Sequence, residues 1–293
     1  MSFSNYEQEF VFDGYILSGV QSVDASYGIS EKKINVAGVG FVDAIIDQPL
    51  EGNFSISRQM VSADPVLELD SAGKYKMDEN SVSGAIFYEN KGFGFSNGRV
   101  NRYSVSCSVG DIPSIETDIT IYGDLGKDIA SDLKNNIKDH PPIKFTDQAG
   151  IKLSVSDFQI DPVSDFSYSR SINIVPAYAL PQGGEAEWVA GSGPVRKNLE
   201  PVQMDTQYPI ETDINFTMIA EEYEIRQIRD RIQSAPKSDV KIELHDARDG
   251  TIINAFTGKN VRLISESVNA SVEGELSITL TYKGYESRHN QFI

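Results

Sequence analysis

The sequence contains little of the side-chain chemistry that most metal and redox sites need. Its 293 residues include one cysteine, three histidines and one tryptophan. A single cysteine cannot form a disulfide within the chain, and Cys107 occupies an alternating apolar position where we expect a small buried side chain. No histidine has a second histidine or a cysteine at ligand spacing, so we expect no transition-metal site.

Catalytic motifs and long apolar runs are also missing. The chain has no Walker A loop, and Gly191-Ser192-Gly193 lacks the strand–turn–helix pattern of a nucleophile elbow. We therefore expect neither an enzyme nor a bound cofactor. No apolar run approaches the roughly 18 residues of a membrane-spanning helix. Residues 1–7 carry neither the basic nor the apolar segment of a secretory leader, so we expect a soluble protein without a secretory address.

Basic residues are outnumbered by acidic ones. The chain has 26 Lys and Arg against 43 Asp and Glu, a net charge of −17. A surface of that sign repels nucleic-acid phosphates, so binding of DNA through basic contacts is disfavoured. The same repulsion suits a surface past which DNA slides without adhering.

The chain does contain an internal repeat rich in alternating apolar residues. Residues 100–123 match residues 261–284 at a constant shift of 161, which places Ile119 on Leu280. Residues 49–57 independently match residues 209–217 at a shift of 160. Period-two alternation is typical of strands with one buried face. We interpret the chain as a tandem duplication of one β domain, with chance alignment of two β-rich halves as the alternative.

The predicted fold class is mainly β: two tandem β-sandwich or barrel domains, each with a flanking α-helix and a long hairpin arm. We assign residues 1–126 to the first repeat, 127–142 to a helical linker, and 143–293 to the second repeat with an inserted loop at 180–203. Turn residues predict hairpins at 85–95 and 242–256. Apolar periodicity and capping residues predict helices at 60–69, 127–138 and 220–233.

The expected arms carry apolar residues around glycine-rich tips such as Gly38-Val39-Gly40. Long apolar arms that a core does not require tend to pack on another subunit, and a plain core hairpin is the alternative. The tryptophan of the inserted loop is either a contact anchor or a clamp on its own loop. The candidate contact residues of the arms are Ile34, Val36, Val39, Phe41, Val42, Ile45 and Trp188.

The order of these elements follows a distinctive opening strand. Phe10, Gly14, Ile16 and Gly19-Val20-Gln21-Ser22 form this opening, and a long arm, a helix, a hairpin and closing antiparallel strands follow. This arrangement resembles the phage tail tube protein family, whose domains also occur in baseplate hub and distal tail proteins. The resemblance implies a virion protein, assembled in the host cytoplasm, whose domains form six-membered rings. The usual subunit has one such domain, so two in this chain imply rings of three chains.

The resemblance also implies partners and a channel. The partners are further copies of the chain and other tail or baseplate proteins, with a sheath as one candidate, while DNA passes without specific binding. A channel wall for DNA should carry an excess of carboxylates, although a solvated outer face also explains acidic residues. The candidate lumen carboxylates are Asp43, Asp47, Glu51, Asp205, Glu211 and Asp213.

Two other functions remain open at this point. One is a baseplate hub or a distal tail adaptor built from the same type of domain. The other, from a different class, is a β-sandwich module of the tail that binds a receptor or carbohydrate. Such a module would have a concave site lined by aromatic residues.

Overall fold

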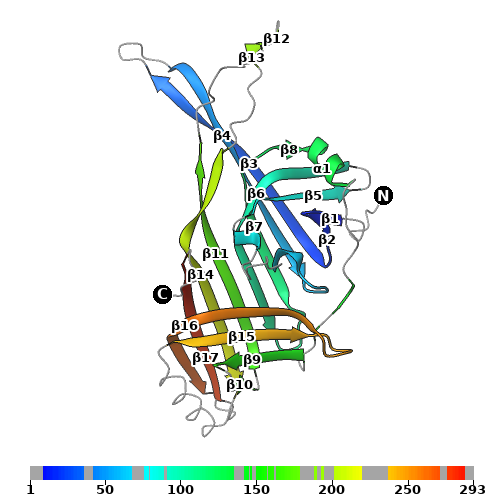
Figure 1. Ribbon diagram of the computed structural model, residues 1–293, viewed down its shortest axis with the longest axis vertical. Coiled ribbons are helices and arrows are strands. Elements are labelled where there is room, and N and C mark those ends of the chain that lie inside the picture. The colour runs from blue at the N-terminus through cyan, green and yellow to red at the C-terminus, as the bar shows by residue number, and fades with distance from the viewer. Residues whose placement is uncertain are drawn as a thin grey trace.

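The computed structural model describes residues 9–35, 42–67, 76–78, 80–88, 91–134, 142–144, 146, 150–156, 158–161, 163–178, 188–189, 193–194, 201–219, 237–270 and 276–287. Over this part the chain is mainly β, as predicted, and its main element is a 15-stranded sheet (Figure 1). A separate two-stranded pair is formed by β12 (Trp188–Val189) and β13 (Gly193–Pro194). The helix described is α1 (Lys127–Lys134).

The first half of the chain forms a unit of antiparallel strands. Their order in space is β2-β1-β5-β6-β7-β4-β3, and the short strand β8 adds to β6. The strands span β1 (Glu9–Phe12), β2 (Tyr15–Leu17), β3 (Val20–Asn35), β4 (Val42–Gln59), β5 (Val82–Tyr88), β6 (Lys91–Ser108), β7 (Ser114–Ile121) and β8 (Leu125–Gly126).

The second half repeats this order. Its strands pair as β10-β9-β15-β16-β17-β14-β11, again antiparallel throughout. They span β9 (Ile151–Val155), β10 (Phe158–Ile160), β11 (Val163–Ala177), β14 (Gln203–Ile219), β15 (Ser238–His245), β16 (Ile252–Ala270) and β17 (Leu276–Glu286).

Strand ends and β-bulges fix which residues of the two halves correspond. Strand β4 ends at Gln59 and β14 ends at Ile219, a shift of 160, which agrees with the sequence alignment of this segment. Strand β3 begins at Val20 and β11 begins at Val163, a shift of 143. Since the shifts differ, the second half carries its additional residues between β11 and β14, where the inserted loop was predicted.

The alignment of the closing strands needs a correction. The bulge that follows Val100 in β6 corresponds to the bulge that follows Leu263 in β16, a shift of 163 rather than 161. Ile119 therefore corresponds to Tyr282 and not to Leu280. A slip of two residues preserves the alternation of buried and exposed positions, so the sequence pattern could not detect it.

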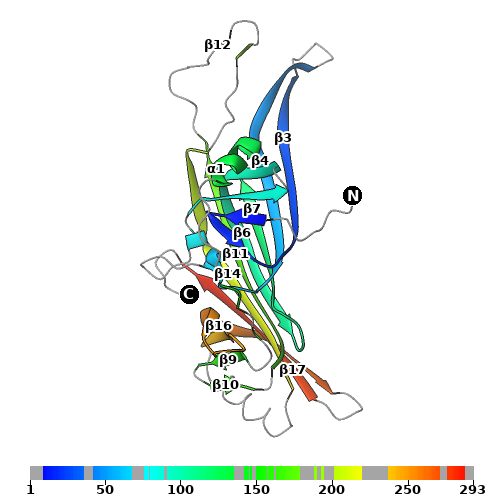
Figure 2. The ribbon, with the colours of Figure 1, turned by 90° about the vertical axis from the view of Figure 1, so that its right-hand side faces the viewer.

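Each repeat is a two-layered sandwich because one long strand, β6 in the first repeat and β16 in the second, belongs to both layers. Residues 91–98 of β6 pair with β5 in a small layer, and residues 98–106 pair with β7 in a central layer. The small layer stands in front of the central strands in Figure 2. Phe54 of the central layer packs on Phe95 of the small layer, with ring centroids 4.8 Å apart. In the second repeat Tyr168 packs on Phe256 in the same way, at 5.2 Å.

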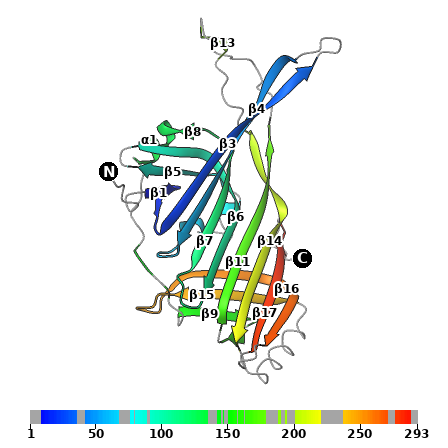
Figure 3. The same cartoon turned by 180° about the vertical axis from the view of Figure 1, so that it is seen from behind.

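The two central layers join into one sheet. Strand β6 of the first repeat pairs with β11 of the second, with Val105 opposite Tyr168. We call this β6–β11 pairing the internal joint. Figure 3 shows the resulting row of strands side by side across both repeats, and the β3–β4 hairpin projects beyond it.

Local predictions met different outcomes. The two hairpins are confirmed as β5–β6 and β15–β16. The helix at 127–138 is confirmed over α1, whereas the helix at 220–233 lies outside the described residues. The helix at 60–69 is wrong, since residues 60–64 are irregular and only a 3-10 turn, Pro65–Leu67, follows them. Asp64 caps that turn by accepting a 2.9 Å hydrogen bond from the Val66 amide. The predicted domain boundaries stay a prediction.

Candidate functional site

The face of the central sheet that points away from the core is polar over both repeats. Strand β7 alternates buried Ile115, Thr117 and Ile119 with outward residues, and β14 alternates in the same way. The outward residues of these two strands, which are serine, threonine, asparagine or acidic, are Ser114, Glu116, Asp118, Thr120, Glu211, Asp213, Asn215 and Thr217. We call this surface the polar face.

Side-chain hydrogen bonds connect neighbouring strands along the polar face. Ser55 of β4 donates to the carboxylate of Asp118 on β7, and Asn215 of β14 donates to Ser167 of β11 at 3.2 Å. Between β14 and β17, the hydroxyls of Thr217 and Thr279 lie 2.9 Å apart. These hydrogen bonds between short polar side chains link neighbouring strands along the face.

Three of the predicted lumen carboxylates lie on the polar face. Glu51 is exposed on β4, while Glu211 and Asp213 are half-buried on β14. Lys283 of β17 lies 3.0 Å from a Glu211 oxygen and 3.8 Å from an Asp213 oxygen. The hydrogen bond to Glu211, followed by the charge of Asp213, raises the pKa of Lys283. Part of the acidic charge is therefore compensated locally.

The remaining predicted carboxylates lie on the extended arm strands. Asp205 of β14 is exposed and accepts a 2.7 Å hydrogen bond from Gln203, away from the sheet centre. Asp43 and Asp47 belong to β4, but their side chains lie outside the described part of the structure.

Other acidic residues of this face were not predicted. Asp24, Glu116, Asp118 and Asp165 all occupy outward positions of central strands. Basic side chains also reach it, among them Arg102, which pairs across from Asp118. The missed carboxylates alternate with apolar residues, so the period-two pattern contained the signal that would have identified them.

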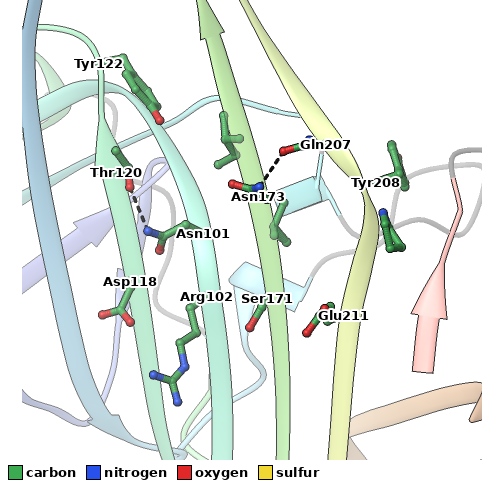
Figure 4. A pocket seen from close by; sticks show the side chains of 13 residues that line it. Asn101, Arg102, Asp118, Thr120, Tyr122, Ser171, Asn173, Gln207, Tyr208 and Glu211 are labelled. Atoms are coloured by element: carbon green, nitrogen blue, oxygen red, sulfur yellow. Dashed lines mark hydrogen bonds between the residues drawn. The ribbon is translucent and has the colours of Figure 1, made fainter. Parts of the chain in front are cut away.

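A cleft of about 700 Å³ opens on this face where β6 and β11 diverge above the internal joint (Figure 4). On one wall Asn101 donates a 2.9 Å hydrogen bond to Thr120, and on the other Asn173 donates a 2.7 Å hydrogen bond to Gln207. The Oδ1 atom of Asn101 is buried and has no hydrogen-bond partner among the described residues. The cleft is thus rich in amide groups that can bind a polar ligand.

Tyrosines near the cleft lie close to a carboxylate. Burial, followed by the charge of Glu51, raises the pKa of Tyr122 and also that of Tyr178. Both phenols therefore stay protonated at neutral pH and can donate hydrogen bonds.

On the core side of the internal joint, two acidic residues from the connection between β4 and β5 bond to side chains of the joined strands. Asp64 accepts hydrogen bonds from Arg58 of β4 and, at 2.6 Å, from the Tyr103 hydroxyl of β6. Asp78 forms an ion pair with Arg170 of β11, and both side chains are buried. We call these five residues, Arg58, Asp64, Asp78, Tyr103 and Arg170, the joint clamp. Each acidic residue thus bonds to a strand that forms the joint.

The electrostatic state of the joint clamp follows from its contacts. Burial alone would lower the pKa of Arg170, but Tyr168, Asp78 and Glu286 together raise it, so the guanidinium stays charged. Burial, followed by the charge of Asp64, raises the pKa of Tyr103 well above its ordinary value. At physiological pH the Arg170 guanidinium is therefore charged and the Tyr103 phenol is neutral.

The two outermost strands of the central sheet are exposed. Along β3 the described residues pair only with β4, and beyond residue 261 those of β16 pair only with β17. Tyr27 on β3 is 65% exposed and Val268 on β16 is 52% exposed. Large apolar side chains are thus presented at both lateral edges of the molecule.

The predicted arm contacts are only partly described. The backbones of Ile34, Val42 and Ile45 lie in the β3–β4 hairpin, where Ile34 pairs with Ala44 and Asn35 with Val42. The backbone of Trp188 pairs with Pro194 between β12 and β13. The side chains of these residues lie outside the described part, as do Val36, Val39 and Phe41 altogether.

Metal clusters and membrane-spanning helices are absent from the described residues. No group of three or more His, Cys, Asp or Glu side chains in that part of the chain could hold a metal ion. Cys107 is buried, as predicted. Within the same ranges, no helix has the length and apolar character needed to cross a membrane.

No protein-family model matches the chain, and no curated protein sequence matches it.

Proposed function

We propose that this chain is a structural protein of a phage virion, a tail tube subunit without catalytic activity. Three chains would close a ring of six repeats, and the rings would stack into a tube that conducts DNA. One observation carries the proposal: two repeats of identical strand order lie side by side in one sheet. Each chain therefore already contains two consecutive positions of a lateral assembly, and closed cyclic assemblies protect sheet edges that would otherwise be exposed.

The polar face is suited to the wall of such a channel. Its small hydroxyl and amide side chains offer few basic contacts to a DNA backbone, and its carboxylates repel phosphates. In this proposal Glu51, Glu211 and Asp213 face the passing DNA, which binds to no specific site. Mobile cations screen the repulsion over about 8 Å at physiological ionic strength, so DNA is kept in motion rather than excluded.

The projecting arms suit contacts between successive rings. The β3–β4 hairpin extends past the body of the molecule along its long axis (Figure 1). Such a hairpin can reach a copy in the next ring, and other tail or baseplate proteins, including a sheath, would bind the outside of the tube. The protein would assemble in the host cytoplasm and remain in the virion.

Electron microscopy of the purified full chain tests this function. We expect rings with three-fold symmetry and tubes whose central channel is lined by the polar face. A baseplate hub or a distal tail adaptor would give the same rings without continuous tubes. Stable monomers at high protein concentration, or rings of six chains, would contradict the proposal.

The cleft favours a second candidate function, a tail module that binds carbohydrate. Amide side chains such as Asn101, Asn173 and Gln207, together with Tyr208, form the type of surface that hydrogen-bonds sugar hydroxyls. A glycan-array screen with the wild type and with Asn173→Ala distinguishes the two functions. Saturable binding that the substitution abolishes would support the module, whereas tube formation without glycan binding would support the subunit.

A further inference from the structure

On the premise of the ring proposed above, we infer that copies of this chain join head to tail by pairing the outer edge of β16 with the outer edge of β3. The register of this pairing is that of β6 with β11 at the internal joint. The partner is a second copy of the same chain, and two different edges meet. We call this contact the joint between copies.

The register follows from the correspondence between the repeats. Ala25 pairs with Phe54 on β4, and Tyr168 pairs with Ile214 on β14, so Ala25 and Tyr168 occupy equivalent positions. On the other side, Val105 and Val268 are equivalent at the shift of 163 defined by the bulges. Because Val105 lies opposite Tyr168 in the internal joint, Val268 lies opposite Ala25 in the joint between copies.

The neighbouring pairs follow from the antiparallel direction. Asp24 lies opposite Asn269, and Ser26 lies opposite Ser267, all four with exposed side chains. These two pairs belong to the polar face, so the joint continues that face from one copy to the next. The pair of Ala25 and Val268 points to the core side.

Exposure at the edges supports the inference. At the internal joint, where Val105 and Tyr168 lie opposite each other, Val105 is 1% exposed and Tyr168 is 0% exposed. At the outer edges the equivalent positions are open, and Val268 is 52% exposed. Burial of apolar surface by the next copy contributes about 25 cal/mol per Å² and completes the core on both sides. Open strand edges with apolar side chains also favour pairing over solvation.

The joint between copies differs from the internal joint in its chemistry. Tyr103 and Arg170 face each other in the internal joint, and both belong to the joint clamp. Their equivalents at the outer edges are Glu266 and Tyr27. The buried Arg170–Asp78 ion pair therefore has no equivalent there, because Tyr27 is uncharged. Copies are held together by strand pairing and apolar contact, so the joint should depend little on salt.

Double-cysteine variants of the full chain test the register. The in-register variants are Asp24→Cys with Asn269→Cys and Ser26→Cys with Ser267→Cys. The matched controls exchange the same four positions: Asp24→Cys with Ser267→Cys, and Ser26→Cys with Asn269→Cys. Opposite residues of antiparallel strands have Cα atoms about 4.5–5.5 Å apart, within disulfide range, whereas diagonal neighbours are about 7–8 Å apart.

After mild oxidation, we expect in-register variants to give at least about tenfold more linked chains than the exchanged variants on non-reducing denaturing gels. The linked product should end at three chains, and the wild type should give none because Cys107 is buried. Equal linkage in all four variants, or linkage in single-cysteine variants, would overturn the inference. Tubes seen by microscopy without in-register linkage would reject this joint but not the tube. Linked trimers that never stack would support the joint and reject the tube.

Discussion

Arg170 of β11 binds Asp78 through two parallel hydrogen bonds, Nε to Oδ1 at 3.1 Å and Nη2 to Oδ2 at 2.5 Å. The two residues come from different repeats, and both are buried. Arg99 of β6 also donates a 3.0 Å hydrogen bond to the backbone carbonyl of Asp78. A single turn of chain, Lys76–Asp78, thus contacts the strands on both sides of the internal joint.

Asp78→Asn should strongly destabilise the protein, because it leaves the Arg170 charge buried with Glu286 as its remaining carboxylate partner. We expect the free energy of unfolding to fall by roughly 3 kcal/mol. Urea unfolding followed by circular dichroism measures it. Glu243→Gln is the matched control, since it removes a surface ion pair with Lys241 and should cost less than about 1 kcal/mol. Equal effects of the two substitutions would show that the joint clamp does not stabilise the fold.

Val268→Lys should prevent association without unfolding the chain. The side chain is half exposed in the single chain, but assembly would bury the new charge opposite Ala25. We expect association to weaken by at least about tenfold. Sedimentation velocity measures association, and the circular dichroism spectrum should be unchanged.

Ser267→Lys is the control for that experiment, because it adds the same charge on the polar face, where it stays in water. If Ser267→Lys weakens association as much as Val268→Lys does, the assignment of Val268 to the core side of the joint is wrong.

Gly94→Ala should displace α1 from the small layer. A Cβ atom at this position would lie 2.9 Å from the backbone nitrogen of Ala130 and 3.1 Å from the Ala85 Cβ. Overpacking of this kind costs about 1–3 kcal/mol, measured as a lower free energy of unfolding. At Gly28 nothing lies within 4 Å of an added Cβ, so Gly28→Ala should leave the stability of the single chain nearly unchanged. A neutral Gly94→Ala would mean that α1 does not pack closely there.

Cys107 should be unreactive at neutral pH. Burial, followed by the charge of Asp111, raises its pKa from 9.0 to about 11. Iodoacetamide at pH 8 should therefore label the native protein far more slowly than the protein in urea. The unfolded thiol ionises first as the pH rises, so the stability from the protonated folded thiol is complete below about pH 9 and is lost toward about pH 11. A Cys107→Ala variant should lose part of this alkaline slope, and fast labelling of the native chain would contradict the burial.

Reversal of charge on the polar face should make assembled tubes adhere to DNA. With Glu51→Lys, Glu116→Lys and Asp24→Lys combined, we expect binding of duplex DNA that weakens as salt increases. Wild-type tubes should not bind DNA in the same electrophoretic assay. Three reversals away from the polar face, at Asp239, Glu243 and Asp249, provide the control. DNA binding by the control variant alone would show that the polar face is not the surface that DNA reaches.

Local sequence patterns predicted the repeat and its hairpins, because strand alternation and hairpin turns depend on residues that are close in sequence. The alternation in β7 and β17 showed which residues are buried, yet it fitted shifts of 161 and 163 equally well. Only the bulges after Val100 and Leu263 distinguish the two, and a bulge has no strong signature in sequence.

The failed helix at 60–69 and the internal joint have a common cause. Asp64 looked like a helix cap, but its carboxylate is occupied by Arg58 and by Tyr103, which lies 39 residues further along the chain. Likewise, the pairing of Val105 with Tyr168 depends on how the two repeats meet, and neither local sequence specifies it. Contacts between residues that are distant in sequence therefore determine how the strands of the polar face and its edges are positioned.

The fusion of two repeats through the internal joint has a kinetic consequence for assembly. The proposed ring of three chains has six seams, and three of them, one inside each chain, form as the chains fold, at any protein concentration. Only three bodies then lose translational freedom on closure instead of six, which lowers the critical concentration for nucleating a ring. The three seams inside the chains carry the buried Arg170–Asp78 ion pair, so mechanical rupture of the proposed tube should start at the other three.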